Sequence, residues 1–547
     1  MIYIDPPYNT GHDFIYEDDF SQNADQYNQS SGQLDENGYR MFENIESNGR
    51  IHTDWLNMIY PRLKICKDFL SDDGAIFISI DENEQATLKN VCDEIFGEKN
   101  FVAGMIWSGG RKNDSKYISV SHEYILCYFK NIDYIKKNKI IWREKKHGLE
   151  PIYKEYAFLK KTYKNDYETM TRELRKWYKQ LPDESPSKEH AHYKSIYENG
   201  IYFPSDISWP GGGGPKYEIL HPVTKLPVKI PSRGWITGKT TLEKWIEEGK
   251  VAFGEDETKV PTLKSYLKDS EYTVPYSVIY KDGRAASKRL ANLMGDKVFE
   301  NPKDEEILAK IIQFCGVEDD DIVFDFFSGS GTTAHAVMIS NLQRSKHVKY
   351  ILVQIPEIID PSKAKSEKSK KVAKNALSLL NSLNLPNNIC SIAEERIKRA
   401  GQALRSQTGV NTDYGFRCFK VDTSNMKNVY YMPSQYNQNL FEELADNIKN
   451  DRTALDLLIQ VMLDLGIDLS SKIEKITISG KQVFKVADNY LYACFDKDIT
   501  GEVVKKIAEK HPYYAVFRDY SMATDSVAVN FDQIFNTYSP KTIRKVL

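Results

Sequence analysis

The chain has 547 residues, of which 41% are hydrophobic and 28% charged, which is enough apolar material for about two to four packed domains. The formal net charge of −3 excludes a uniformly basic nucleic-acid coat, although a whole-chain average can hide a local basic face. Seven scattered cysteines with no C-x-x-C pair support neither a disulfide framework nor a zinc knuckle, and no apolar run is long enough for a membrane span. We therefore expect a cytoplasmic protein with no metal and no membrane partner.

The first elements alternate as they do in an α/β sheet. A β-type run over residues 1–4 stops at two prolines, which remove backbone donors. The pattern then predicts, in chain order, a polar loop over 20–50, an amphipathic helix over 53–70, a buried parallel strand over 74–81, a helix over 83–96 and strands over 101–107 and 122–130.

The composition changes between residues 131 and 285, where Tyr, Lys and Trp are interleaved with turns. The α/β pattern resumes with a helix over 303–315 and strands over 322–327 and 349–355. We interpret this as one sheet interrupted by an insertion. The expected domains are a catalytic half of the core over 1–130, an insertion over 131–285, a cofactor half over 286–400 and a C-terminal α/β domain over 401–547.

The first candidate site is Asp5-Pro6-Pro7-Tyr8, at the carboxyl end of a predicted strand, where open α/β sheets bind ligands. Such a set suits the exocyclic amine of a flat base, whose lone pair is delocalised into the ring. Asp5 and the Pro6 carbonyl can accept both N–H bonds and so favour a tetrahedral nitrogen, while Tyr8 stacks on a base taken out of the helix. The alternative is a proline-rich turn after a strand.

The second candidate site follows the predicted strand over 322–327 and precedes a helix. Its glycines let a backbone approach a ligand closely, and the helix start offers free N–H groups. A third glycine and a P-loop lysine are missing, which disfavours NAD and ATP. By itself the pattern is nearly as typical of a plain strand-to-helix turn. The residues are Asp325, Phe326, Phe327, Ser328, Gly329, Ser330, Gly331, Thr332 and Thr333.

The two motifs together, with the Asp-Pro-Pro-Tyr motif first, resemble DNA amino-methyltransferases of the β group. The stretches IDPPYNTGHDFIYEDDF (4–20), DFFSGSGTTAHAV (325–337), GWITGKTTLEKWIEEGKVAFG (234–254) and RIKRAGQ (396–402) are similar to the modification subunits of type III restriction-modification systems. The resemblance covers essentially the whole chain. It implies a Rossmann-like methyltransferase sheet with permuted motif order, S-adenosylmethionine as cofactor and an inserted target-recognition domain.

The same resemblance assigns roles by position. Asp5 to Tyr8 become the catalytic tetrad, and Asp325 to Thr333 become the loop for the methionine moiety of the cofactor. Asn301, Pro302 and Lys303 match a motif that closes over the methionine end, although Asp304 stands where a second proline is common. Gln354 occupies the place of an acid that grips the ribose hydroxyls in most β-group enzymes; its amide can still bond a diol, without charge assistance.

Residues 131–180 contain 14 Lys plus Arg against 7 Asp plus Glu, interleaved with six Tyr and two Trp. Phosphate neutralisation and base stacking both favour this mixture, so we expect DNA contacts from Lys136, Lys137, Lys145 and Lys146. The alternative is a solvated helical face with its aromatic rings turned inward. The histidines of Glu189-His190-Ala191-His192 lack a further ligand at metal-site spacing and are expected to be exposed.

The sequence therefore predicts a DNA adenine-N6 methyltransferase that acts on double-stranded DNA with a flipped adenine. The resemblance implies a homodimer and a helicase-nuclease restriction subunit as partner. The alternatives are a stand-alone enzyme, an enzyme acting on cytosine N4, and a truncated subunit that binds DNA without catalysis. Asp rather than Ser before Pro-Pro-Tyr favours adenine. The family usually carries a segment ahead of the catalytic strand, so a version extended upstream is expected to be more stable and more active.

Overall fold

The computed structural model describes residues 1–10, 51–109, 116–364, 366–409, 413–427, 448–518 and 525–547. The polar loop predicted over 20–50 lies outside these residues, as does most of the stretch 4–20. The chain divides into two compact units, residues 1–415 and 416–547, which are described separately.

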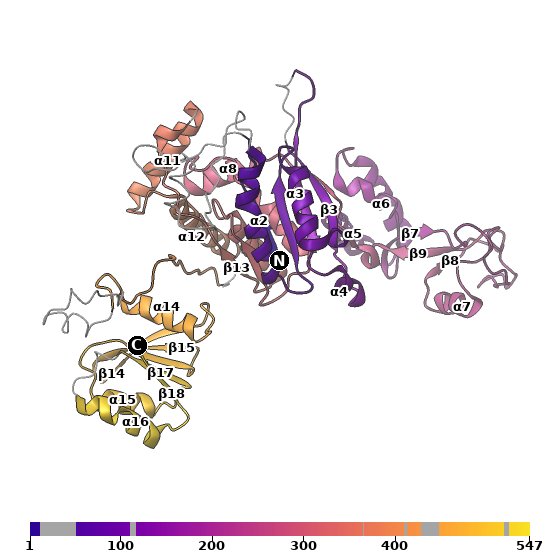
Figure 1. Cartoon of the computed structure of the whole chain (residues 1–547). Coiled ribbons are helices and arrows are strands. Elements are labelled where there is room, and N and C mark those ends of the chain that lie inside the picture. The colour runs from indigo at the N-terminus through magenta and orange to yellow at the C-terminus, as the bar shows by residue number, and fades with distance from the viewer. Residues whose placement is uncertain (11–50, 110–115, 365, 410–412, 428–447, 519–524) are drawn as a thin grey trace. The chain divides into compact units, whose positions relative to one another are not determined.

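The first unit is built on a seven-stranded sheet (Figure 1). Its strand β1 (Ile2–Ile4) lies between β2 (Ala75–Ile80) and β12 (Ile322–Asp325) and is parallel to both. On one side the sheet continues with β13 (Lys349–Leu352), and on the other with β4, β3 and β11. The outer strands are β4 (His122–Phe129), β3 (Phe101–Ser108) and β11 (Val278–Tyr280), and β4 runs antiparallel to both of its neighbours.

Helices cover both faces of this sheet, which is why its central strands read as continuous apolar runs. The helices α2 (Ile51–Phe69) and α3 (Gln85–Cys92) pack on one face, where Trp55, Ile59 and Leu63 of the amphipathic helix α2 are fully buried. On the opposite face lie α9 (Glu305–Phe314) and α10 (Thr332–Arg344). The predicted α/β fold with one interrupted sheet is confirmed.

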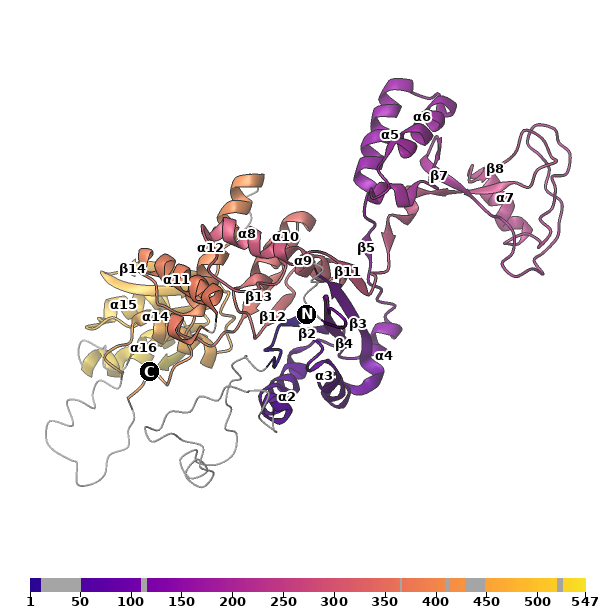
Figure 2. The same cartoon turned by 90° about the horizontal axis from the view of Figure 1, so that it is seen from above.

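The interruption begins and ends close to the sheet. After α4 (Ile132–Lys137), the side chain of Trp142 still packs in the core of the sheet. The short strand β5 (Glu144–Lys145) then pairs antiparallel with β10 (Tyr272–Thr273), so the two ends of the insertion lie side by side (Figure 2). The sequence boundaries of 131 and 285 therefore include two segments, α4 and β11, that pack with the core.

The insertion contains a helical pair followed by a small sheet. The helices are α5 (Leu149–Tyr163) and α6 (Tyr167–Gln180), which share one apolar cluster. The antiparallel sheet has the order β6 (Ser195–Tyr197), β7 (Gly200–Ser205), β9 (Thr262–Tyr266), β8 (Val251–Ala252), and α7 (Lys239–Glu247) precedes β8.

Three further helices of the first unit lie within the described residues: α8 (Arg284–Met294), α11 (Glu367–Ser382) and α12 (Ile389–Thr408). The second unit is a five-stranded sheet with α14 (Ala454–Asp464) on one face and α15 (Gly501–Ala508) and α16 (Asp525–Tyr538) on the other. Its strands, in spatial order, are β14 (Ile473–Ile478), β15 (Lys481–Val486), β16 (Leu491–Cys494), β17 (Tyr514–Phe517) and β18 (Ile543–Val546). Within the described residues, no helix is both long enough and apolar enough to cross a membrane.

Asp304 explains how the chain enters α9 without the second proline of the family pattern. Its fully buried carboxylate accepts hydrogen bonds from the backbone N–H groups of Glu306 and Ile307, which caps the helix. The same carboxylate pairs with Lys281 at 3.0 Å and with Arg289 at 2.9 Å. A capping carboxylate thus joins α9 to the segment before α8 and to α8 itself.

We predict that Asp304→Ala lowers the free energy of unfolding by about 3 kcal/mol, because it removes the cap and takes one buried carboxylate away from two cations. Asp304→Asn keeps an acceptor for the cap and loses only the charge, so its loss should be smaller by about 1 kcal/mol. Urea unfolding followed by circular dichroism measures both. Equal losses for the two variants would show that the cap contributes nothing.

Candidate functional site

The predicted catalytic tetrad follows β1 directly and is held from two sides. Trp55 on α2 donates a hydrogen bond from its indole nitrogen to the Pro7 carbonyl oxygen at 2.7 Å. Asn9, which has a left-handed backbone φ of 60°, donates from its side chain to the buried Glu84 carboxylate at 2.5 Å. The loop is thus fixed by groups that lie about 50 to 80 residues away in sequence.

Two charged side chains from other parts of the chain meet Asp5 and Tyr8. The ammonium Nζ of Lys303 lies 3.3 Å from Asp5 Oδ1 and 2.6 Å from Glu123 Oε2, and it also donates to the Tyr8 hydroxyl. The Tyr8 hydroxyl in turn donates to Glu123 Oε2 at 3.1 Å. Lys303 Nζ stands 4.7 Å from the centre of the Tyr8 ring, within cation–π range. The structure therefore places Lys303 against the tetrad, and its predicted contact with the cofactor stays a prediction.

Burial and charge act in opposite directions on these groups. Burial raises the pKa of Asp5, Lys303 acts to lower it, and the negative charge of Glu123 raises it further. Burial disfavours the ammonium of Lys303, but the carboxylates of Asp5 and Glu123 raise the pKa of Lys303 above its ordinary value. The cluster therefore holds a protonated lysine beside a carboxyl group that is easier to protonate than usual.

The second predicted loop begins at the end of β12, next to β1 in the sheet. Asp325 is 3% exposed, and its carboxylate accepts from the Thr333 hydroxyl at 2.5 Å and from the Phe327 N–H at 3.0 Å. Burial raises the pKa of Asp325 to about 7, against these two hydrogen bonds. Asp325 therefore closes the loop onto the first turn of α10.

The glycines of this loop have the backbone that close approach to a ligand requires. Gly329 and Gly331 have φ values of 49° and 74°, and the loop runs straight into the first turn of α10. The Gly329 N–H donates to Gln354 Oε1 at 2.8 Å, so the structure brings these two predicted cofactor residues together. A Cβ on Gly329 would lie 3.4 Å from the ring of Phe299, which precedes Asn301 and Pro302.

A pocket of about 290 Å³ borders the same loop. Three predicted cofactor residues, Phe326, Phe327 and Gln354, form part of its wall. The rest of the wall is mainly apolar and comes from α2, β12 and the residues after β13. The loop, its glycines and this pocket fit a ligand with a flat ring, a polar tail and a diol.

Sequence reasoning misses two charged residues of the site. Arg396 of α12 is 1% exposed and donates to the hydroxyls of Ser330 at 2.8 Å and Thr332 at 2.6 Å. Its segment RIKRAGQ is distinctive only as a family resemblance, because a buried arginine has no periodic signature of its own. Glu123 lies at the start of β4. Because β4 runs antiparallel to β2, the start of β4 lies at the edge of the sheet where the parallel strands end.

The four lysines predicted to contact DNA lie on two short elements. Lys136 and Lys137 end α4, Lys145 is in β5 and Lys146 follows it. The first three are exposed, and Lys145 Nζ lies 3.9 Å from Glu271. Two aromatic side chains of this segment, Trp142 and Tyr178, pack in apolar clusters, as the solvated-face alternative expects.

The prediction that both histidines of 189–192 are exposed is wrong for His190. His190 is 8% exposed, and its Nε2 forms a hydrogen bond with the His147 carbonyl oxygen at 2.7 Å, so packing rather than solvation determines its place. The residues that the structure describes contain no group of three His, Cys, Asp or Glu side chains arranged to hold a metal ion.

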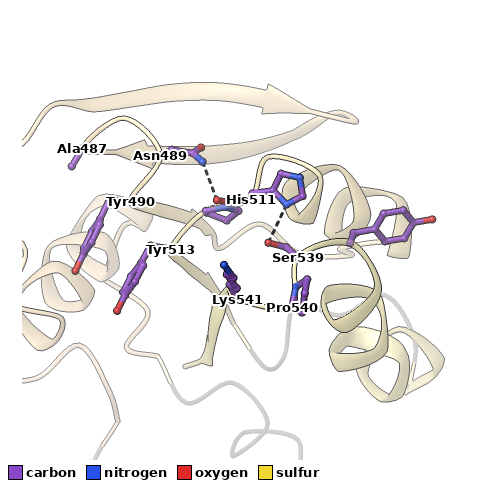
Figure 3. Close-up of a pocket in the computed structure, with 10 residues that line it drawn as sticks. Ala487, Asn489, Tyr490, His511, Tyr513, Ser539, Pro540 and Lys541 are labelled. Carbon is purple, nitrogen blue, oxygen red and sulfur yellow. Dashed lines mark hydrogen bonds between the residues drawn. The ribbon is translucent and has the colours of Figure 1, made fainter.

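The second unit has a pocket of its own, of about 610 Å³ (Figure 3). Beside it the rings of Tyr490 and Tyr513 stack with centroids 5.0 Å apart and planes within 4° of parallel. His511 lies within 3.3 Å of the Ser539 hydroxyl in the same wall. None of the predicted site residues lines this pocket.

Comparison with known proteins decides the family. Residues 1–359 match the DNA methylase family. The Mod subunit of the type III restriction-modification enzyme EcoP15I from Escherichia coli is 34% identical over 516 residues, which are 93% of this chain and 74% of that protein. This chain belongs to the DNA methylases, among the type III Mod subunits.

Two further relatives extend the comparison. The StyLTI Mod subunit of Salmonella typhimurium is 32% identical over 429 residues, 77% of this chain and 57% of that protein. The type II methyltransferase M.KpnI of Klebsiella pneumoniae is 27% identical over 358 residues, 64% of this chain and 74% of that protein. The predicted family is confirmed, and with it a DNA methyltransferase that uses S-adenosylmethionine.

We predict a distinctive pH dependence from Asp325 in this Mod-family chain. The Asp325 carboxyl has a pKa of about 7 in the folded chain and an ordinary value of 3.8 in the unfolded chain. Between these pH values the native state therefore binds more protons than the unfolded state. Its contribution to the free energy of unfolding therefore falls as pH rises from about 4 to 7, by on the order of 4 kcal/mol in full. Asp325→Asn should remove this fall, as measured by urea unfolding across that range.

Asp360→Asn is the matched control. Hydrogen bonds from Ser362 lower the pKa of the Asp360 carboxyl, so any pH dependence that it adds lies below about pH 4. If the wild-type chain and Asp325→Asn showed parallel stability curves between pH 4 and 7, the raised pKa would be disproved.

Proposed function

We propose that this chain transfers the sulfonium methyl group of S-adenosylmethionine to the N6 amine of a flipped adenine in double-stranded DNA. We further propose that it is the modification and recognition subunit of a type III restriction-modification system. The observation that carries the proposal is the adjacency of two loops. Asp5 to Tyr8 leave the sheet from β1, and the glycine loop leaves it from the neighbouring strand β12, at the same edge.

The tetrad has the groups that an amine acceptor needs. Asp5 presents a carboxylate and Pro6 a carbonyl oxygen, and together they can accept the two N–H bonds of the amine. Bound S-adenosylmethionine would supply the methyl group to this nitrogen, with the electron pair of the carbon–sulfur bond leaving on sulfur. The nitrogen then loses a proton, and Asp5 is the carboxylate of the tetrad that can accept it. The acceleration comes from positioning.

The glycine loop fits the cofactor assigned to it. The first turn of α10 can offer backbone N–H groups to a carboxylate tail, and Gln354 can turn its amide to a ribose diol. Asn301 and Pro302 precede α9 and lie in the segment that follows Phe299, whose ring approaches Gly329. S-adenosylmethionine would supply the methyl group there, while the chain supplies its orientation.

Adenine is preferred to cytosine N4 because Asp rather than Ser precedes Pro-Pro-Tyr. The direct test is to methylate DNA with the purified chain, digest it to nucleosides and identify the product by mass spectrometry. N6-methyladenine supports the proposal, and N4-methylcytosine would replace it by the alternative specificity.

The relatives also support two partner proposals. Three of the similar proteins are named as Mod subunits of type III enzymes, which supports association of this chain with a helicase-nuclease restriction subunit and, by family resemblance, with a second copy of itself. We propose that the second unit, residues 416–547, contributes assembly or DNA contacts. Co-expression of the chain with a type III helicase-nuclease subunit, followed by co-purification and light scattering, tests both associations.

We predict that Asp5→Ala abolishes methyl transfer and leaves the dissociation constant of S-adenosylmethionine within a few-fold of the wild type. The reason is that the carboxylate acts on the base rather than on the methionine moiety. Calorimetry measures cofactor binding and a radiolabel assay measures transfer. Gly329→Ala is the converse variant, because its left-handed φ disfavours a side chain, and it should weaken cofactor binding first. Equal loss of both properties in Asp5→Ala would contradict the assignment.

The lysine assignment makes a separate prediction. Replacing Lys136, Lys137 and Lys145 by glutamine should reduce the slope of log affinity against log salt by about 0.9 for each DNA phosphate that the variant no longer neutralises. Fluorescence anisotropy with duplex DNA measures the slope. The matched control replaces Lys154, Lys176 and Lys250, which are exposed but paired with Glu150, Glu173 and Glu248. If both triple variants changed the slope equally, DNA binding would depend on net charge alone.

A further inference from the structure

Lys303 is more enclosed than either of the two carboxylates with which it pairs. Its side chain is 10% exposed, against 29% for Asp5 and 40% for Glu123. It precedes α9 and reaches across to residues from β4 and from the loop after β1. Besides the Tyr8 ring, Nζ faces the ring of Trp107 at 5.7 Å from its centre. A lysine held in such surroundings must be matched by specific partners.

The ammonium of Lys303 has three oxygen neighbours. It donates hydrogen bonds to Glu123 Oε2 and to the Tyr8 hydroxyl oxygen, and it forms an ion pair with Asp5 Oδ1 at 3.3 Å. One cation therefore serves two carboxylates, from Asp5 and Glu123. The contact of Lys303 Nζ with Glu123 is shorter than its contact with Asp5. Glu123 therefore determines where the ammonium lies, and the positive charge of the ammonium acts on Asp5.

Titratable groups from several elements lie around Asp5, and the positive charge of Lys303 opposes the negative charges among them. The groups that act on Asp5, or are acted on by it, are Tyr3 on β1, Tyr8 in its own loop, Glu123 on β4, Lys303 before α9 and Asp325 on β12. Glu123 and Asp325 are carboxylates and the tyrosines are neutral at ordinary pH. Without Lys303, a desolvated Asp5 would face negative charge.

The proposed reaction needs Asp5 in its ionised form. A carboxylate accepts hydrogen bonds with both oxygens, whereas a carboxylic acid carries a donor of its own and holds an amine less well. We propose that Lys303 is a positioning residue that keeps Asp5 ionised and aimed at the target amine, and that Glu123 holds Lys303 in place. This inference rests on the proposed function, because it takes Asp5 as the acceptor of the amine.

The two residues should change the pH profile of methyl transfer in opposite directions. Lys303→Met removes the attractive charge with little change in length, so the acid limb should move up by about one to three pH units. At a pH below the acid limbs of both proteins, transfer by Lys303→Met should be about tenfold or more slower than transfer by the wild type, and it should recover at high pH. Glu123→Gln removes a repulsive charge and keeps an amide oxygen that can still accept from Lys303, so its acid limb should move down. In the double variant the two displacements should largely cancel.

Lys281→Met is the matched control. This variant also removes an ammonium that pairs with a buried carboxylate, but the partners of Lys281 are Asp304 and Glu306 rather than Asp5. Its acid limb should stay with that of the wild type. Single-turnover transfer with saturating S-adenosylmethionine, measured from pH 5 to 9, provides all five profiles. If Lys303→Met lost activity equally at every pH, with no displaced limb, the proposal would be overturned.

A second readout needs no activity and separates this inference from the proposed function. The difference in free energy of unfolding between the wild type and Asp5→Asn bends at the pH where Asp5 titrates in the folded chain. Repeating the pair in a Lys303→Met background should move that bend to higher pH. If the bend moves but no methylated base forms, the inference stands and the proposed function fails. If Lys303→Met leaves the bend unmoved, the inference fails whatever the activity.

Discussion

The backbone pairing of β1 is the constraint on which the site depends. Three residues, Ile2 to Ile4, bond to β2 on one edge and β12 on the other, and the Met1 carbonyl oxygen accepts from the Phe324 N–H at 2.9 Å. Ile2 and Ile4 face the cluster under α2, while Tyr3 faces the opposite cluster. A strand packed on both faces and paired on both edges has little freedom, so Asp5 inherits its position from the sheet.

The same pairing sets the distance between the two loops. Because β12 is the parallel neighbour of β1, the glycine loop and the tetrad start from adjacent strand ends in a register determined by backbone hydrogen bonds. Side chains then hold each loop to other helices, with Trp55 acting on the tetrad and Arg396 on the glycine loop. Mutations in either helix can therefore loosen one loop while the sheet keeps the other in place.

The sequence predicts the elements and the two loops because each carries a local signal. Prolines end β1, an apolar run marks β2, and glycines mark the turn into α10. The partner residues Glu123, Arg396 and Trp55 are not predictable as site residues, because they act over long sequence separations. The sequence pattern around an arginine in a helix, or around a glutamate at the start of a strand, is the same whether the side chain faces water or a loop. Lys303 belongs to a motif that the family resemblance identifies, but the resemblance does not predict its contact with Asp5.

The strand pair β5 and β10 has a consequence for how such a chain can diversify. Because the two ends of the insertion are tied together by Glu144 to Lys145 and Tyr272 to Thr273, everything between them is attached to the sheet through one narrow neck. A different sequence of similar end-to-end spacing can occupy this place without changing a strand of the core. Recombination with both crossovers in the neck would thus exchange one insertion for another while the strand ends that carry Asp5 and Asp325 stay as they are.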